Sequence, residues 1–155
     1  VQKKWQPIVK QVVLPEDVRA SAQVANRLEK ADIIFIAPSN PFVSIDPILN
    51  VYPIREMVMD LPQATIAVSP IIGDSAVKGP AAKMMQEMGM AVSATAVATY
   101  YGDLIDGFVY DSSDPNPVEL TETAVLRTNT LMQNSSDRRR LAEEVLAFAQ
   151  QIIDG

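Results

Sequence analysis

The stretch ADIIFIAPSNP, residues 31–41, decides the fold class of this chain. Its centre, residues 33–37, is an uninterrupted run of apolar side chains. Such a short apolar run is typical of a parallel strand that is covered by helices on both faces. Pro38 and Pro41 then end the strand, because proline has no amide hydrogen to donate to a neighbouring strand. The stretch therefore predicts a buried parallel strand followed by a rigid loop.

Strands and helices alternate along the rest of the chain. Residues 65–68 (TIAV) repeat the buried-strand pattern, and helical spacing of apolar residues follows most strands. This alternation predicts an α/β fold, with a mostly parallel, Rossmann-like three-layer sheet that carries helices on both faces. The expected elements are a strand at 8–14, a helix at 16–30, the strand at 33–37, a helix from Asp46 that breaks at Pro53 and resumes over 54–59, a strand at 65–68, a helix from Pro80 to Met88 closed by Gly89, a helix at 93–101, strands at 107–110 and 125–127, and a last helix capped by Ser135 or Ser136.

Composition limits the chemistry that the chain can perform. The 155 residues suit a single α/β domain over 1–155, and 48% of them are apolar, enough for a sizeable core. There is no cysteine and no histidine, so any chemistry must use carboxylates, Lys, Arg, hydroxyls, backbone amides or a hard cation. A net charge of −6 disfavours nucleic acid as a partner. We find no apolar run of membrane-spanning length and no signal-peptide core, and therefore expect a cytoplasmic protein without a membrane partner.

The first candidate site is the loop at residues 38–44. Its prolines fix the backbone, and Ser39, Asn40 and Ser44 offer hydroxyl and amide groups to the oxygens of a nucleotide or a phosphate. In open α/β sheets, ligands bind beyond the carboxyl ends of the strands, where this loop lies. The alternative is a rigid connection whose Ser and Asn side chains only cap the next helix. Arg55 is a candidate to buttress the loop, or else a helix-surface residue.

The second candidate site is the loop at residues 69–80, after the next buried strand. Gly73 and Gly79 allow the backbone to approach a ligand, and Lys78 supplies a positive charge. The helix that follows directs free amides toward the same space. The loop lacks the G-x-x-x-x-G-K-[ST] pattern of a Walker loop. The alternative is a helix-start loop with a solvated lysine.

Two further groups carry weaker signals. Asp103, Asp106 and Asp111 surround a turn, and clustered carboxylates can hold Mg²⁺, although carboxylates at such positions more often cap loops. We therefore assign no metal ligand in this chain. Tyr100 and Tyr101 are candidates for stacking on a base, and core packing is the alternative.

Four blocks of the sequence resemble one known family in order and spacing. They are ADIIFIAPSNPFVSIDPIL, PIRE, AVSPIIGDSAVKGPAAKMM and YYGDLIDGFVYD, within a resemblance that covers residues 1–153. Together they resemble the 2-phospho-L-lactate transferase family of coenzyme F420 biosynthesis. The resemblance implies transfer of a phospholactyl or phosphoenolpyruvyl group from a guanosine diphosphate-linked donor to the deazaflavin Fo, with release of GMP and use of Mg²⁺.

The same resemblance implies that the chain is part of a longer transferase. Family members are roughly twice as long and open with a Gly-rich, GGTGG-like phosphate loop that these residues lack. The chain VQKKWQPIV… also begins without Met, so we expect the carboxy-terminal half of such an enzyme, incomplete and inactive alone, with the Mg²⁺ ligands elsewhere. An apolar face left by the missing half could also make it a homodimer.

Two other functional interpretations stay open at this point. One is a non-catalytic regulator that binds nucleotide sugars, as in the related gluconeogenesis-factor-like proteins. The other is a structural or oligomerisation module without a ligand.

Overall fold

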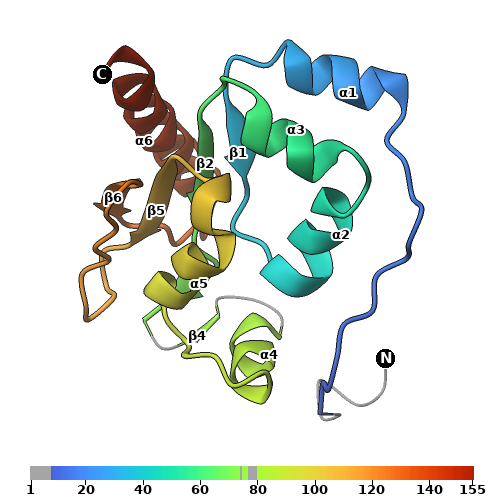
Figure 1. Ribbon diagram of the computed structural model, residues 1–155. Helices are drawn as coiled ribbons and strands as arrows, with labels where there is room; N and C mark the ends of the chain where they lie inside the picture. The colour runs from blue at the N-terminus through green and yellow to red at the C-terminus, as the bar shows by residue number, and fades with distance from the viewer. Residues whose placement is uncertain (1–7, 74, 77–79) are drawn as a thin grey trace.

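The computed structural model describes residues 8–73, 75–76 and 80–155. Its centre is a four-stranded sheet in the order β1-β2-β5-β6, in which every neighbouring pair is parallel (Figure 1). The predicted α/β fold with a parallel, Rossmann-like sheet is therefore confirmed. The strands of this sheet are β1 (Ile34–Ile36), β2 (Thr65–Val68), β5 (Gly107–Asp111) and β6 (Ala124–Thr128).

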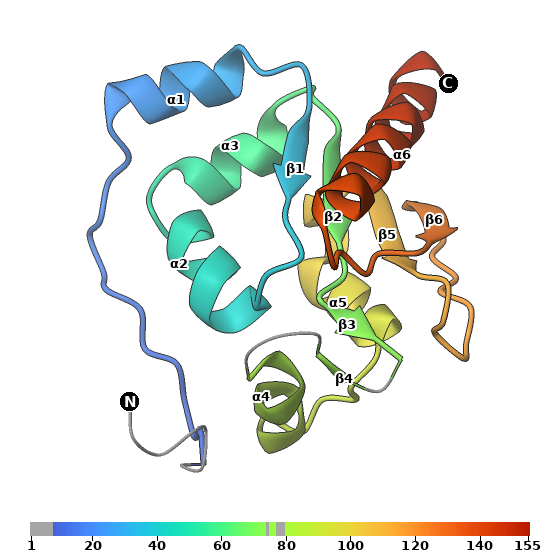
Figure 2. The same ribbon diagram turned by 180° about the vertical axis from the view of Figure 1, so that it is seen from behind.

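Helices cover both faces of the sheet, as the apolar runs predict. Helix α6 lies alone on one face, and α2 to α5 lie on the other (Figure 2). Each face has its own apolar core: Ile66 and Val109 pack toward α6, whereas Ala67 and Phe108 pack toward the other helices. The helices are α1 (Ala22–Glu29), α2 (Asp46–Leu49), α3 (Ile54–Asp60), α4 (Ala81–Glu87), α5 (Ala94–Tyr101) and α6 (Ser135–Asp154), with a π-helical turn η1 (Pro41–Ile45) and a 3₁₀ turn η2 (Gly102–Leu104).

Side-chain hydrogen bonds cap the starts of α1, α5 and α6. The Ser93 hydroxyl accepts the Ala96 amide at the start of α5, and Gly89 ends α4 with a φ of +75°, a backbone conformation that favours glycine. The expected cap of the last helix was wrong by one or two residues. Asn134, rather than Ser135 or Ser136, caps α6, because its side chain accepts the Asp137 amide while the Asp137 carboxylate accepts the Asn134 amide.

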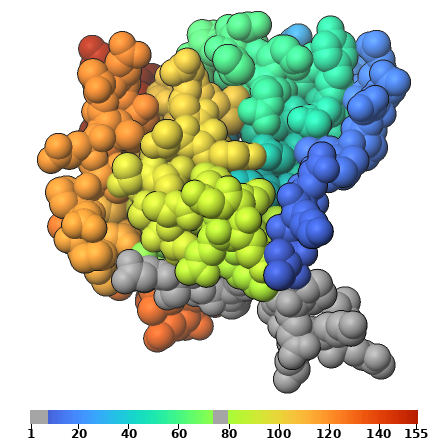
Figure 3. All heavy atoms as spheres, turned by 60° about the horizontal axis from the view of Figure 1, so that its bottom comes forward, coloured from blue at the N-terminus to red at the C-terminus, as the bar shows by residue number. Residues whose placement is uncertain are grey.

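The amino-terminal segment departs from prediction. Residues 8–14 form no strand, since no described strand lies beside them to complete a ladder. They run in extended form past α2 and α4, where the Val9 amide donates to Glu87 (Figure 3). The helix expected at 16–30 begins only at Ala22, because Asp17 takes a left-handed φ of +60° and the chain is not helical until Ser21 caps α1.

The loop after β2 contains a small hairpin. Strands β3 (Ile71–Ile72) and β4 (Ser75–Ala76) pair antiparallel, and Gly73 between them has a φ of +59°. Among the described residues, no helix combines the length and the hydrophobicity that a bilayer crossing requires.

Candidate functional site

The carboxyl ends of the four parallel strands meet at one edge of the sheet. The two loops that the sequence singles out leave this edge from β1 and β2, which are direct neighbours. The loops that follow β5 and β6 leave the same edge, because these strands are parallel to β2. This is the edge at which α/β sheets bind ligands, so the site is built from it.

Asn40 organises the loop that follows β1. Its Oδ1 accepts the amides of Phe42 at 2.9 Å and Val43 at 3.3 Å, which caps the π-helical turn η1. Its Nδ2 lies 3.4 Å from the Met84 sulfur on α4. The capping alternative thus describes the Asn40 oxygen, while a ligand contact by Asn40 stays a prediction. Single π-helical turns occur often at functional sites.

A cavity of about 370 Å³ opens beside β1, on the face covered by α2 and α3. Ser39 and Ser44 both line it, so the structure brings two of the predicted hydroxyls together. The remaining lining residues are apolar: Leu28, Ile34, Phe35, Ile36, Ala37, Ile45, Ile48, Leu49, Ile54 and Val58. Two hydroxyls at an apolar cavity suit a ligand that needs few oriented hydrogen bonds.

Asp46 braces the helix that follows this loop. Arg55 donates to one carboxylate oxygen at 3.0 Å, and the Tyr100 hydroxyl donates to the other. The Tyr100 ring also meets Phe42 of η1 edge-on, with centroids 5.0 Å apart. Burial, followed by the Asp46 contact, raises the pKa of Tyr100 above its usual value. Arg55 therefore buttresses the loop through Asp46.

Tyr101 points to the interior instead. It is buried within the core, and burial raises the pKa of its phenol above the usual value. The core-packing alternative therefore describes Tyr101, whereas its neighbour Tyr100 stays partly exposed.

The β2 loop is described only in part. Ser69 is buried, and its hydroxyl accepts the Ile71 amide at 3.1 Å. The Gly73 amide donates to the Asp114 side chain, which ties this loop to the one after β5. Lys78 and Gly79 lie outside the described residues, and their predicted roles are therefore untested.

Asp111 joins the ends of β5 and β6. One oxygen accepts the amide and hydroxyl of Ser113 at 2.8 and 2.6 Å, and the other accepts those of Thr130 at 2.6 and 3.0 Å. Burial alone would raise the pKa of Asp111, but these hydrogen bonds outweigh it and hold the pKa below its usual value.

Asp114 is a buried acid that the sequence interpretation missed. It is 4% exposed, and its Oδ2 has no hydrogen-bond partner among the described residues. Burial, together with the nearby charge of Asp111, raises its pKa. The available signal was DSSDP directly after a buried strand, where a second acid follows the first by three residues.

The three aspartates weighed as a cation site do not converge. Asp106 precedes β5 and accepts the Thr65 amide at 2.7 Å, whereas Asp111 ends the same strand. Five strand residues span about 16 Å. In the part of the chain that the structure describes, no three side chains of the Asp, Glu, His or Cys types gather as metal ligands.

Comparison with known proteins decides the family. The family model described as "2-phospho-L-lactate transferase CofD" matches residues 1–152. The chain belongs to the 2-phospho-L-lactate transferase family. The resemblance of the four sequence blocks is thereby confirmed.

Curated relatives agree with this assignment. A 2-phospho-L-lactate transferase of Methanosarcina acetivorans is 41% identical over 145 residues, which cover 88% of this chain and 47% of the relative. That of Methanocaldococcus jannaschii is 39% identical over 121 residues, covering 78% of this chain and 38% of the relative. This transferase-family chain thus spans less than half the length of these relatives.

Proposed function

We propose that the protein containing this chain transfers a phospholactyl, or phosphoenolpyruvyl, group from a guanosine diphosphate-linked donor to the deazaflavin Fo and releases GMP, in coenzyme F420 biosynthesis. The proposal rests on the family match over residues 1–152. It is supported by the position of Ser39 and Ser44, which share a cavity at the carboxyl end of β1.

In the proposed reaction, the Fo hydroxyl attacks the phosphorus that carries the lactyl group. The phosphoanhydride bond to GMP breaks, and GMP leaves with the bonding electron pair. Catalysis of such a transfer is mainly positioning and charge stabilisation. Ser39, Ser44 and the Asn40 Nδ2 hydrogen that is not directed at Met84 would bind oxygens of the guanylated donor. The Gly73–Gly79 loop with Lys78 would face the anionic region.

The proton of the Fo hydroxyl needs an acceptor. The chain has no histidine, so a base from this chain would be a carboxylate. The unpaired oxygen of Asp114 is buried, so Asp114 is not accessible as that base. We propose that the base lies in the part of the family that this chain does not match.

Among the described residues, no three metal-ligating side chains gather, so they offer no all-protein cage for Mg²⁺. We propose that the Mg²⁺ ligands also come from the unmatched part.

The test is incubation of the complete protein with Fo and a guanylated donor, with GMP release as the readout. We expect GMP and a phospholactyl-Fo product in equal amounts, and no turnover by the 155-residue chain alone. Binding of GDP-sugars without GMP release would instead favour the regulatory alternative. No thermal shift of the complete protein with GDP would favour a structural module.

A further inference from the structure

Strand β1 is an edge strand with the character of an interior strand. It pairs with β2 on one side, and no described strand pairs with its other side. Natural edge strands are usually protected by lysine, proline or a bulge. β1 reads Ile-Phe-Ile and has none of these, and Phe35 at its centre is 43% exposed.

The free edge presents ordered backbone groups. The Ile34 amide donates to Ala64 on the β2 side at 3.0 Å. Because successive residues of a strand alternate in direction, the Phe35 amide and carbonyl point to the free side. They are positioned to continue a parallel ladder.

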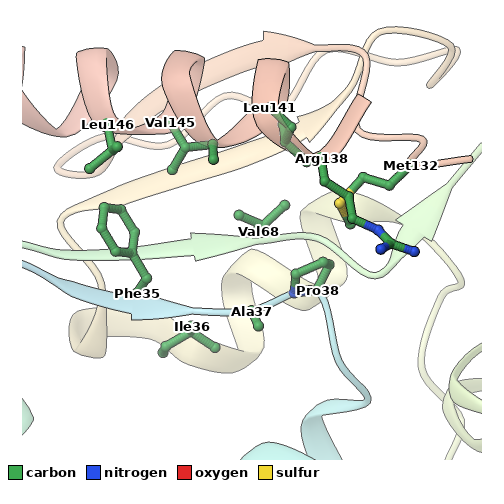
Figure 4. A pocket seen from close by; sticks show the side chains of 11 residues that line it. Phe35, Ile36, Ala37, Pro38, Val68, Met132, Arg138, Leu141, Val145 and Leu146 are labelled. Carbon is green, nitrogen blue, oxygen red and sulfur yellow. The ribbon is translucent and has the colours of Figure 1, made fainter. Parts of the chain in front are cut away.

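Apolar cavities flank β1 on both faces of the sheet. On the α6 face, a cavity of about 320 Å³ is lined by Phe35, Val68, Leu141 and Leu146, with Phe35 directed toward α6 (Figure 4). Leu146 is 51% exposed there. On the other face is the 370 Å³ cavity, where Ile48 is 56% exposed. Contiguous apolar surface of this kind marks an interface.

The strand order shows where further strands belong. The sheet runs β1-β2-β5-β6 in chain order, so its strand order never reverses among the described strands. Doubly wound sheets contain such a reversal, and it lies beside the first strand of each half. The free edge of β1 is that position. The M. acetivorans relative has more than half of its length outside its match, enough to supply the other half.

We propose that β1 pairs along its free edge with a parallel strand from the part of the family that this chain does not match. Helices flanking that strand cover the apolar surface of the two cavities. Ser39 and Ser44 remain at the carboxyl-end rim, beside the new strand.

The test co-expresses this chain with a tagged polypeptide that comprises the part of the M. acetivorans relative outside its match. We expect a 1:1 complex by light scattering. In hydrogen exchange, the Phe35 amide should slow at least tenfold in the complex, while the Ile34 amide, which is already bonded to β2, should change less. Phe35→Lys should abolish the complex. Val24→Lys on α1, at 42% exposure and outside both cavities, is the matched control and should leave it intact.

Circular dichroism of Phe35→Lys alone verifies that the variant folds, which its partial exposure permits. Failure of the folded chains to associate, an unchanged exchange rate at Phe35, or equal capture of Phe35→Lys would each overturn the proposal. So would a homodimer of this chain that Phe35→Lys dissociates, because a second copy would then occupy the edge. No nucleotide or Fo is present, so the result does not depend on the proposed reaction.

Discussion

Replacing Asp111 by Asn tests how the carboxyl edge of the sheet is held together. Asp111 accepts two backbone amides, one from Ser113 and one from Thr130, each on a different oxygen. Asn has only one acceptor oxygen, so its NH₂ group must face one of these amides. The Ser113 and Thr130 hydroxyls can turn to accept from the new NH₂, but a backbone amide cannot. One charge-assisted hydrogen bond is therefore lost, at a cost of about 1.5–3 kcal/mol.

The assay is urea unfolding at pH 7, where this loss lowers the free energy of unfolding. In a chain of this size, a loss of that magnitude lowers Tm by roughly 3–12 °C. Ser113→Ala is the control, because it removes only a hydroxyl and should cost about 0.5–1.5 kcal/mol. A change below about 0.5 kcal/mol for Asp111→Asn would refute the reasoning.

The same variant has a defined pH dependence. The pKa of Asp111 is lower in the folded than in the unfolded chain. Its stabilisation is therefore complete above the unfolded value of about 4 and is lost as the pH falls through the folded pKa. The difference in the free energy of unfolding between wild type and Asp111→Asn should become smaller below about pH 4.

Three further predictions follow from the same geometry. A Cβ at Gly107 would lie 2.6 Å from Ile66 Cδ1 and 2.7 Å from Ile152 Cδ1, so Gly107→Ala should cost about 1–3 kcal/mol in urea unfolding, and a cost below about 0.5 kcal/mol would contradict this. Burial raises the pKa of Asp114, so the stabilisation from its protonated form is complete below about pH 4 and is lost as the pH rises through the folded pKa. The free energy of unfolding of Asp114→Asn should therefore rise relative to that of wild type between pH 4 and pH 7. Parallel curves of unfolding free energy against pH would contradict this. In the complete protein, Ser39→Ala and Ser44→Ala should each weaken calorimetric GDP affinity roughly tenfold to a hundredfold, and unchanged affinity would remove that serine from the site.

The sequence predicts the sheet well because its signals are local. Residues 33–37 are a continuous apolar run that contains β1, and residues 65–68 (TIAV), apolar after Thr65, form β2. Residues 8–14 carry a similar β-branched pattern but form no strand. A strand needs a partner, and sequence propensity alone does not supply one.

The site was predictable only as a set of loops. Proline and glycine punctuation located the segments after β1 and β2, and Ser39 and Ser44 do share a cavity. The capping role of the Asn40 oxygen and the enclosure of Asp114 depend on tertiary contacts. The sequence names these residues without showing which of their atoms remain available to a ligand.

The charge of the proposed ligand gives a reason to connect the candidate site with the free edge of β1. A diphosphate carries negative charges that must be compensated when they leave water. The described residues that line the Ser39–Ser44 cavity include no lysine or arginine, so hydroxyl hydrogen bonds are what they contribute. Compensation must then come from Lys78, from Mg²⁺ or from the protein beyond β1. If the protein beyond β1 supplies this positive charge, GDP should bind the assembled protein far more tightly than this chain alone. Equal affinities would show that GDP binding at the cavity does not depend on the strand proposed beside β1.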